Sequence, residues 1–457
     1  MKRIGMLILL FFSSISAFCA DSQIYEYTLR NGLKLIVKED HRSPVVVSQV
    51  WYRVGSSYEH NGITGISHVL EHMMFKGTSR FKAGEFSRII AANGGRENAF
   101  TGRDYTAYFQ RLEKSRLKVS FELEADRMRS LKLTDKEFQK ERSVVIEERR
   151  LRTEDKPTAI TYEQFNAVAF QSSPYRIPVI GWMDDLKNLR VEDLQKWYQR
   201  WYAPNNATVV VVGDVVPKQV FLLAKKYFGH LKPSRLDPPK PQREPKQLGI
   251  RRITVKVPAH LPYLMMGYKT PVVGTAHKSW EPYALEVMAY VLDGGRSSRF
   301  TKELIRGKAI AAQITTSYDL HSRLNNLFTI FAIPSQGTSM DALEKAFRRQ
   351  IDKVKKELVS KSELERAKAQ ILAEKIFQQD SVFYQAMNLG LLETTGKGWR
   401  EEANYIANIK NITPEQIRYV ANKYFIDDQL TIARLKPLPM SMKKPIKRTI
   451  RGGRHAR

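Results

Sequence analysis

Runs of apolar residues and regularly spaced polar residues alternate along the chain, and together they predict both strands and helices. Val45–Val54 is apolar and rich in β-branched residues, which predicts a central β-strand. We predict helices over Gly65–Phe75 and Thr134–Arg152. Thr134 and Glu137 have the spacing of a capping box, which satisfies backbone N–H groups at the start of a helix.

One order of elements occurs twice. In "RWYAPNNATVVVVGDV" (Arg200–Val215), aromatic residues close a helix, a polar turn follows, and an apolar β-rich run comes next. The same order is found in "KYFIDDQLTIARLKP" (Lys423–Pro437). Earlier in each half, a helix contains or adjoins a Gly-rich turn, at Ala92–Asn98 and at Asp293–Arg299. We therefore predict an α+β protein of two homologous domains, each a mainly antiparallel sheet with helices packed on one side.

The predicted domain boundary lies in Lys232–Lys246, "KPSRLDPPKPQREPK". Its five prolines are unfavourable inside a helix or strand and predict a linker. Residues 21–231 then form the N-terminal domain and residues 247–437 the C-terminal domain. With 457 residues, 42% of them hydrophobic and 27% charged, the chain has the composition of a globular protein with a sizeable core.

Residues 1–20 have the pattern of an export signal. Two basic residues precede the apolar run Ile4–Phe12, and small residues follow up to Ala20. Cleavage near Ala20 or near Ala17 would fit, whereas lipid attachment at Cys19 fits poorly because an aromatic residue precedes it. We expect an exported protein, periplasmic in a Gram-negative host. No other stretch is apolar enough to span a bilayer, so the mature protein is expected to be soluble.

The net charge of +28 suggests nucleic acid, anionic lipid or acidic substrates as partners. Most Lys and Arg residues lie among acidic residues, however, and no nucleic-acid-binding motif accompanies them. The exception is the tail, residues 438–457, which has seven Lys or Arg and no Asp or Glu. We expect no specific nucleic-acid contact, and weak contact with a membrane surface through this tail stays open.

Cysteine usage restricts the kind of metal site. Cys19 is the only cysteine, so the chain has no thiol once the signal is removed. The mature protein can then form neither a disulfide nor a thiolate metal site. Any metal must be held by His, Asp or Glu.

The segment "GISHVLEHMMFKGT" contains His-x-x-Glu-His. His68 and His72 are four residues apart, so in a helix both project from one face and can hold one zinc ion. Glu71 can point toward a water on the metal, whose pKa zinc lowers to roughly 7, and accept its proton. This is the reverse of the commoner His-Glu-x-x-His order. The alternative is that two histidines share a face by chance.

A third ligand is needed because catalytic zinc usually has three protein ligands and an open position. In "ERSVVIEERR", Glu141 and Glu148 are seven residues apart, which places them two turns apart on one helix face. Glu148 follows His72 by 76 residues. A surface ion pair is the alternative role for Glu141.

This spacing, its flanking residues and the two-half organisation resemble the pitrilysin/insulinase family of zinc peptidases (peptidase family M16), which includes the mitochondrial processing peptidases. The resemblance covers nearly all of the chain after the signal. It implies a zinc metalloendopeptidase with Zn²⁺ held by His68, His72 and Glu148. It also implies that Glu71 is the general base and that Glu141 is an acidic residue supporting the site.

"ENAFTGRDYTAYF" (Glu97–Phe109) resembles the Asn-Ala-aromatic-Thr strand of that family. The resemblance implies an edge strand that pairs with the bound peptide, with Asn98 and Ala99 binding the substrate. Main-chain hydrogen bonds of this kind hold an extended peptide with little demand on its sequence. The alternative is an ordinary strand whose aromatic side chains lie in the core.

One part of the family pattern is missing. "LDGGRSSRF" (Leu292–Phe300) is similar to a family segment, but Ile305 and Ala312 occupy the positions of an Arg and a Tyr that bind substrate and stabilise the oxyanion in single-chain members. Arg306 would substitute only if the register shifts. The resemblance implies an inactive C-terminal domain and a hetero- or homodimer in which a homologous subunit supplies the pair and encloses small or unfolded polypeptides. The alternative is a non-catalytic binding or assembly subunit of a peptidase complex.

Overall fold

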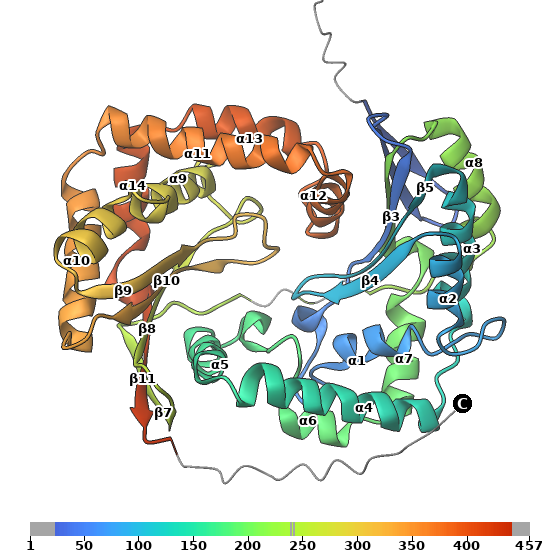
Figure 1. The fold of residues 1–457 in the computed structure, drawn as a ribbon, viewed down its shortest axis with the longest axis horizontal. Helices are drawn as coiled ribbons and strands as arrows, with labels where there is room; N and C mark the ends of the chain where they lie inside the picture. Colours follow the sequence, from blue (N-terminus) through green and yellow to red (C-terminus); the bar gives the residue numbers. More distant parts are fainter. Residues whose placement is uncertain (1–22, 238–239, 241–242, 441–457) are drawn as a thin grey trace, which may run out of the picture.

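The structure is a computed structural model that describes residues 23–237, 240 and 243–440 (Figure 1). The predicted export signal, and the predicted basic tail beyond residue 440, lie outside the described residues. Two β-sheets, each with its own helices, face each other across the molecule (Figure 1). We call the parts around them the N-terminal half (residues 23–231) and the C-terminal half (residues 247–440). No helix of the described residues is long and apolar enough to cross a membrane.

The N-terminal half is built on a six-stranded sheet with the order β1-β2-β6-β3-β5-β4. Neighbouring strands are antiparallel except β2 and β6, which are parallel. The strands are β1 (Ile24–Thr28), β2 (Lys34–Glu39), β3 (Val45–Tyr52), β4 (Arg96–Thr101), β5 (Thr106–Glu113) and β6 (Ala207–Gly213). The helices are α1 (Ile66–Met73), α2 (Glu85–Ala92), α3 (Leu117–Ser130), α4 (Asp135–Arg149), α5 (Pro157–Ala169), α6 (Met183–Asn188), α7 (Val191–Trp201) and α8 (Pro217–Phe228).

The C-terminal half repeats this plan with one strand fewer. Its sheet has the order β7-β11-β8-β10-β9, and only β7 and β11 are parallel. The strands are β7 (Arg251–Pro258), β8 (Tyr263–Thr270), β9 (Ala311–Ser317), β10 (Asn326–Pro334) and β11 (Leu430–Leu438). The helices are α9 (Glu281–Asp293), α10 (Met340–Lys356), α11 (Lys361–Gln379), α12 (Val382–Thr394), α13 (Glu401–Lys410) and α14 (Pro414–Tyr424). The predicted α+β class with two related, mainly antiparallel sheets is confirmed.

The predicted elements are found with small shifts. The strand predicted over Val45–Val54 is β3, between β6 and β5 in the interior of the sheet. The predicted helices are α1 and α4, but α4 ends at Arg149 and the chain continues to Glu154 as a π-helix. The capping box is half formed, since only the Thr134 side chain accepts a hydrogen bond, from the Glu137 N–H.

Each sheet has a second apolar face, and a helix from the other half covers it. α12 of the C-terminal half packs on β3 and β6, where Trp51 and Val210 meet Leu389. α5 of the N-terminal half packs on β7, β8 and β11, where Phe165 meets Met265. The prediction placed helices on one side of each sheet. We call α5 and α12 the exchanged helices. The prediction did not include their packing on the other half, because the pattern of apolar residues in a sequence does not say which half will cover a face.

The two exchanged helices meet their sheets through a large residue against a glycine, with the roles reversed. Trp51 on β3 lies against Gly390 of α12, where an added Cβ would come within 2.2 Å of the indole. Gly267 on β8 lies against Phe165 of α5, where an added Cβ would come within 2.5 Å of the ring. Trp51 pairs with the second residue of β6 and Gly267 with the second residue of β11, so the two positions are equivalent.

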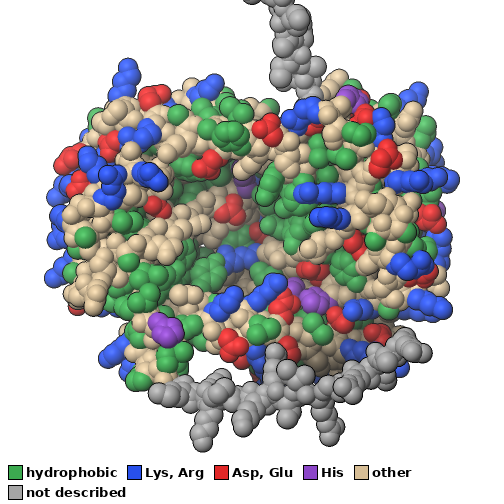
Figure 2. All heavy atoms as spheres, viewed as in Figure 1, with side chains coloured by type: hydrophobic (Ala, Val, Ile, Leu, Met, Phe, Trp, Pro, Cys, Tyr) green, Lys and Arg blue, Asp and Glu red, His purple; other side chains and the backbone are tan. Residues whose placement is uncertain are grey.

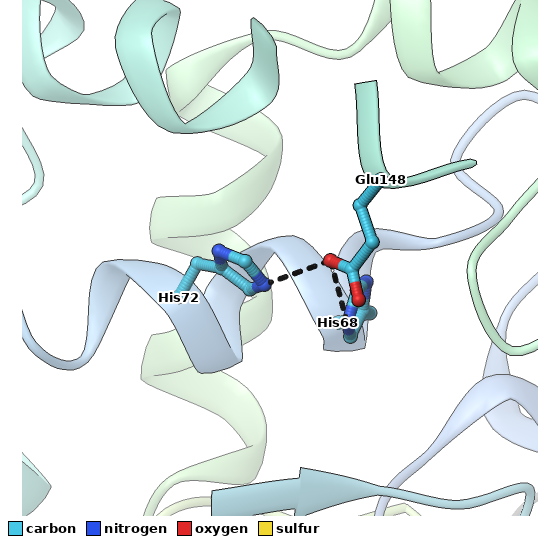
Figure 3. Close-up of side chains that lie close together, drawn as sticks. All are labelled: His68, His72 and Glu148. Carbon is cyan, nitrogen blue, oxygen red and sulfur yellow. Dashed lines mark ion pairs between the residues drawn. The ribbon is translucent and has the colours of Figure 1, made fainter. Parts of the chain in front are cut away.

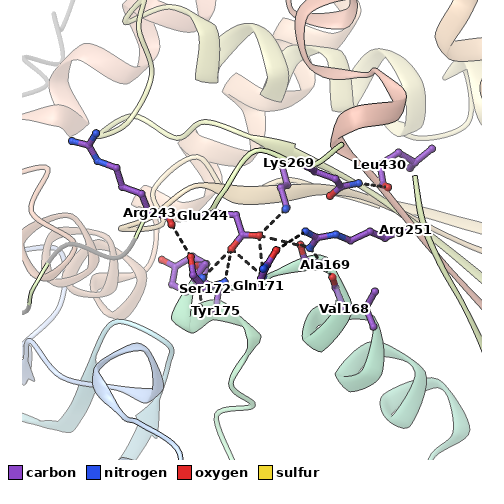
Figure 4. Close-up of polar contacts among 12 residues, drawn as sticks. Val168, Ala169, Gln171, Ser172, Tyr175, Arg243, Glu244, Arg251, Lys269 and Leu430 are labelled. Atoms are coloured by element: carbon purple, nitrogen blue, oxygen red, sulfur yellow. Dashed lines mark hydrogen bonds and ion pairs between the residues drawn. The ribbon is translucent and has the colours of Figure 1, made fainter. Parts of the chain in front are cut away.

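The Pro-rich stretch between the halves contains neither helix nor strand in its described residues. It is nevertheless fixed near its end. The Glu244 carboxylate accepts hydrogen bonds from the backbone N–H groups of Gln171, Ser172 and Ser173 and from Lys269 Nζ at 2.8–3.0 Å (Figure 4). The Glu244 carboxylate thus ties the loop after α5 to β8 of the other half.

The fit between α12 and β3 leads to a stability prediction. Gly390→Val should lower the free energy of unfolding by about 1–3 kcal/mol, because the new side chain must displace the Trp51 indole from a closed core. Thermal and urea unfolding followed by tryptophan fluorescence would measure it. Tyr384→Ala is the matched control on the same helix, since this side chain is 57% exposed. Equal unfolding midpoints for Gly390→Val and the unchanged protein would contradict the packing described.

Candidate metal centre

The first element of the site is α1, and its amphipathic sequence determines which side chains reach the solvent side. Ile66, Val69, Leu70 and Met73 are buried in the N-terminal core. His68, Glu71 and His72 therefore project from the opposite side. The start of α1 is held by buried Glu59, which accepts hydrogen bonds from the N–H groups of Gly65 and Ser67 at 2.7 and 2.9 Å. Burial raises the pKa of Glu59 to about 7.

α4 runs next to α1 and brings Glu148 to the two histidines (Figure 3). Glu148 Oε2 lies 3.7 Å from His68 Nε2 and 3.4 Å from His72 Nε2. One ligand atom from each of the three residues lies within 4.8 Å of the others, and this is the one such group among the described residues. The predicted ligands are thus brought together from two helices, with the open side of the cluster facing a cavity.

The geometry and chemistry of this group fit zinc. Bonds of 2.0–2.1 Å in a tetrahedral site place neighbouring ligand atoms about 3.4 Å apart, close to the two distances from Glu148. Two imidazoles and a carboxylate are a donor set found in catalytic zinc sites. Burial, with a smaller effect of neighbouring His72, lowers the pKa of His68 to about 3 and keeps its ring neutral, as a metal ligand must be.

An acidic residue at Nδ1 orients the ring of His72. Glu141 Oε2 lies 3.4 Å from His72 Nδ1, and Lys76 Nζ lies 2.7 Å from Glu141 Oε1. A carboxylate at Nδ1 favours the tautomer that leaves Nε2 free for a metal. The glutamate predicted from the seven-residue spacing therefore contacts the site. Lys76, four residues after His72, was not predicted from the sequence.

Glu71 lies beside the ligands but points to the sheet. Thr101 Oγ1, at the end of β4, donates a hydrogen bond to Glu71 Oε2. Burial raises the pKa of Glu71, while the Thr101 hydrogen bond opposes that shift. Thr101 is a further site residue. Its signal in the sequence was the alternation of β4, which puts Ala99 and Thr101 on one face.

The exposed side of Glu148 is held by a basic residue that sequence analysis missed. Arg152 Nη1 lies 2.8 Å from Glu148 Oε1, the oxygen not directed at the histidines. Arg152 follows Glu148 by four residues and lies in the π-helical turn after α4. Neighbouring Glu147 pairs with Arg150 instead and is exposed, as expected of a residue that cannot share a face with Glu148.

β4 forms the other wall of the site. It is the last strand of its sheet, so one of its edges has no strand partner in the described residues. Asn98 and Ala99 of this strand line a cavity of about 810 Å³ together with the three candidate ligands and Glu71. Asn98 Oδ1 accepts a hydrogen bond from the Ala99 N–H. The predicted binding residues thus lie at an open strand edge beside the candidate ligands, and their binding of substrate stays a prediction.

The C-terminal half adds no side chain to this cavity, whose lining residues all lie between His68 and Arg152. Ile305 is partly buried and packs against the C-terminal core from a π-helical turn, Thr301–Gly307. Ala312 is exposed on β9, the edge strand equivalent to β4. Arg306 is exposed next to Ile305.

Two family models match this chain, one after the other along the sequence. The family described as "Insulinase (Peptidase family M16)" matches residues 34–181, and "Peptidase M16 inactive domain" matches residues 188–371. The chain is 36% identical over 416 residues to "Zinc protease PqqE" of Helicobacter pylori, covering 90% of this chain and 92% of that protein.

Solved structures agree in fold. "The crystal structure of a protease from Helicobacter pylori" superposes with a TM-score of 0.86 at 34% identity, over 91% of this chain and all of that one. The periplasmic protease PqqL from Escherichia coli has the same fold, with a TM-score of 0.75 at 18% identity, over 92% of this chain and 49% of that protein. The match to family and relative covers the metal-site helices, both sheets and nearly the full length, and the chain belongs to peptidase family M16, the insulinase family.

Proposed function

We propose that this protein is a zinc metalloendopeptidase that hydrolyses peptide bonds in small or unfolded polypeptides. The observation that carries this proposal is the convergence of His68, His72 and Glu148 at distances suited to one tetrahedral ion, with Glu71 beside them. The names of its relatives support it, since the Helicobacter pylori protein and a Bacillus subtilis protein 25% identical to this chain are both described as zinc proteases.

The chain's own residues would divide the work as follows. Zinc, when bound, supplies a Lewis acid that lowers the pKa of a coordinated water toward 7. Glu71 takes the proton of the attacking water and passes it to the leaving amine nitrogen. Thr101 holds one oxygen of Glu71, which leaves the other to accept the proton. Glu141 and Lys76 keep His72 in the tautomer that binds through Nε2.

Substrate would bind as an added strand on β4. Its free edge passes the candidate ligands at Asn98 and Ala99, so a peptide paired there would present its backbone carbonyls to the metal. Only an extended segment can pair in this way. The hollow between the halves, visible in Figure 2, is bounded by both halves and would exclude folded proteins by size.

We further propose that a homologous subunit completes the active site. The positions expected to hold the substrate-binding Arg and Tyr are Ile305, which packs in a core, and exposed Ala312. Neither can donate a hydrogen bond to an oxyanion. We also propose that the predicted signal directs export of the protein, to the periplasm in a Gram-negative host. The basic tail would make weak contact with a membrane surface.

A non-catalytic binding or assembly subunit is the competing function. The match of residues 188–371 to an inactive domain favours it in part. The complete set of candidate ligands and base in the N-terminal half opposes it, because a purely structural subunit has no need of them. Metal analysis of the purified protein separates the two, since the competing function requires no zinc.

Replacing the general base should separate metal binding from catalysis. Glu71→Gln keeps the size and hydrogen bonding of the side chain but cannot accept a proton, so peptide hydrolysis should fall by about 10²–10⁴-fold. Zinc content, measured by atomic absorption, should stay near that of the unchanged protein. A near-normal rate in Glu71→Gln would show that another group is the base.

Loss of the residue behind His72 should weaken zinc binding without removing a ligand. Glu141→Gln should raise the zinc dissociation constant by about 10–100-fold, because His72 loses the charged acceptor at Nδ1. Competition with a fluorescent chelator measures this constant in the absence of any substrate. Glu147→Gln is the matched control on the same helix, since Glu147 is exposed and pairs with Arg150. Equal constants for the two variants would assign Glu141 to an ordinary ion pair.

The proposed subunit arrangement predicts low activity of the chain alone. The absence of one oxyanion donor costs about 10²–10³-fold in other enzymes, so co-purification with a homologous chain that carries the Arg and Tyr should raise kcat by a comparable factor. Light scattering during gel filtration would report the assembly, and a fluorogenic peptide its rate. Full activity from the lone, monomeric chain would refute the arrangement.

A further inference from the structure

A second pocket adjoins the metal cavity and is rich in arginine. It has a volume of about 310 Å³, and Arg152 lines both this pocket and the metal cavity. We call it the arginine pocket. Its lining residues are Arg103, Arg152, Thr153, Ala159, Tyr162, Glu163, Asn166, Tyr175, Arg176, Ile177, Pro178, Val179 and Ile180. Basic side chains are visible inside the hollow between the halves in Figure 2.

Two of its arginines have only neutral partners. Arg103 Nη2 lies 3.3 Å from both Tyr162 Oη and Asn166 Oδ1, and its guanidinium lies 5.1 Å from the centre of the Tyr175 ring. Arg176 Nη2 lies 3.4 Å from Asn61 Oδ1. Within the part of the chain that the structure describes, neither guanidinium has a carboxylate within ion-pair distance.

Glu163, the carboxylate that lines the pocket, and Asp104, next to Arg103 in sequence, are both paired with other cations. Glu163, on its wall, makes a two-pronged ion pair with Arg149 at 2.8 and 2.9 Å. Asp104, next to Arg103 in sequence, is buried and accepts hydrogen bonds from Ser57 and from Arg323 of the C-terminal half. Both negative charges are therefore compensated already. The pocket retains a positive potential, which a concave wall of low dielectric strengthens.

We propose that the arginine pocket binds a carboxylate of the substrate peptide and so gives the enzyme a preference for acidic substrates. This inference rests on the proposed peptidase function and specifies its substrate class. Arginine pairs with carboxylates through two parallel hydrogen bonds, and such charge-assisted bonds are stronger than neutral ones. Ala159 and the segment Ile177–Ile180 form an apolar wall of the pocket, which can contact the methylene groups that carry the carboxylate.

The position of the pocket along β4 indicates which substrate residue it would meet. Ala99 lies in the metal cavity, and Arg103 lies four residues further along the chain, two residues beyond the end of β4. Arg103 lies in the turn between β4 and β5, so a peptide that pairs with β4 and continues past its end would bring a side chain to the pocket a few residues from the cleaved bond. The carboxylate could come from an Asp or Glu side chain or from the C-terminus of a short peptide.

The test is a set of internally quenched peptides that differ in one residue. Asp is compared with Asn at each of five positions on both sides of a fixed cleavage site, and each peptide is made with a free or an amidated C-terminus. We expect Asp at one position, or a free C-terminus at one length, to raise kcat/KM by about tenfold over its neutral partner. In Arg103→Gln and Arg176→Gln this ratio should fall toward one, and in Arg103→Lys it should be largely kept.

Controls separate a local effect from net charge and from folding. Arg88→Gln changes the net charge equally but lies outside both pockets, so it should keep the ratio. Unfolding midpoints of all variants check that the fold persists. A preference that follows an internal Asp assigns the pocket to an acidic side chain, and one that follows only the free C-terminus assigns it to the terminal carboxylate. Ratios near one throughout, or a ratio unchanged in both pocket variants, would overturn the proposal.

Binding distinguishes this inference from the proposed function. Fluorescence anisotropy of the same labelled peptides with Glu71→Gln protein measures the acidic preference without hydrolysis. If no peptide is cleaved by the unchanged protein but the Asp peptides still bind about tenfold tighter than the Asn peptides, the peptidase proposal fails and the carboxylate pocket stands. If peptides are cleaved without any acidic preference, the peptidase proposal stands and the carboxylate pocket fails.

Discussion

The packing of a helix from one half on the sheet of the other is the constraint on which the rest of the structure depends. Without α12, the face of the first sheet that carries Trp51 and Val210 would lie open to water, and without α5 the face of the second sheet that carries Met265 would do so. Such contiguous apolar faces are rare on soluble proteins. The two halves therefore hold each other in place through closed cores, and the Pro-rich connection has only to span the distance between them.

This frame fixes the walls of the hollow, and the metal-site helices are part of one wall. α1 is buried along one side and held at its start by Glu59, so it can offer His68, Glu71 and His72 in only one direction. α4 meets it with Glu148 and Glu141. Each functional group is then fixed by a neighbour, Glu71 by Thr101, His72 by Glu141 and Glu148 by Arg152. A site held in this way loses little further freedom when it binds an ion, which favours both affinity and a constant geometry.

The sequence alone predicted the parts of this site that depend on helical spacing. Residues four and seven apart lie on one face of any helix, so His68 with His72 and Glu141 with Glu148 could be paired before the fold was known. Contacts between distant elements could not be found in this way. The hydrogen bond from Thr101 to Glu71 depends on where β4 ends relative to α1. The exchange of α5 and α12 depends on surfaces far apart in sequence, about 100 residues for Phe165 with Met265 and more than 300 for Trp51 with Leu389. The continuous apolar run of β6 was a sign that both faces of the sheet are buried, but not of what buries them.

The two halves show how one scaffold can carry chemistry in one copy and only packing in the other. Their sheets have the same strand order, and even the large residue and the glycine at the exchanged helices occupy equivalent strand positions. In the C-terminal half, α9 follows β8 as α1 follows β3 in the N-terminal half. Most side chains of α9 are buried, among them Leu285, Met288 and Leu292. A helix that is apolar on so many sides has no face left for metal ligands. The C-terminal half therefore has the parts that close the hollow and cover the partner sheet, but its described residues contain no group of three side chains placed to hold a metal ion.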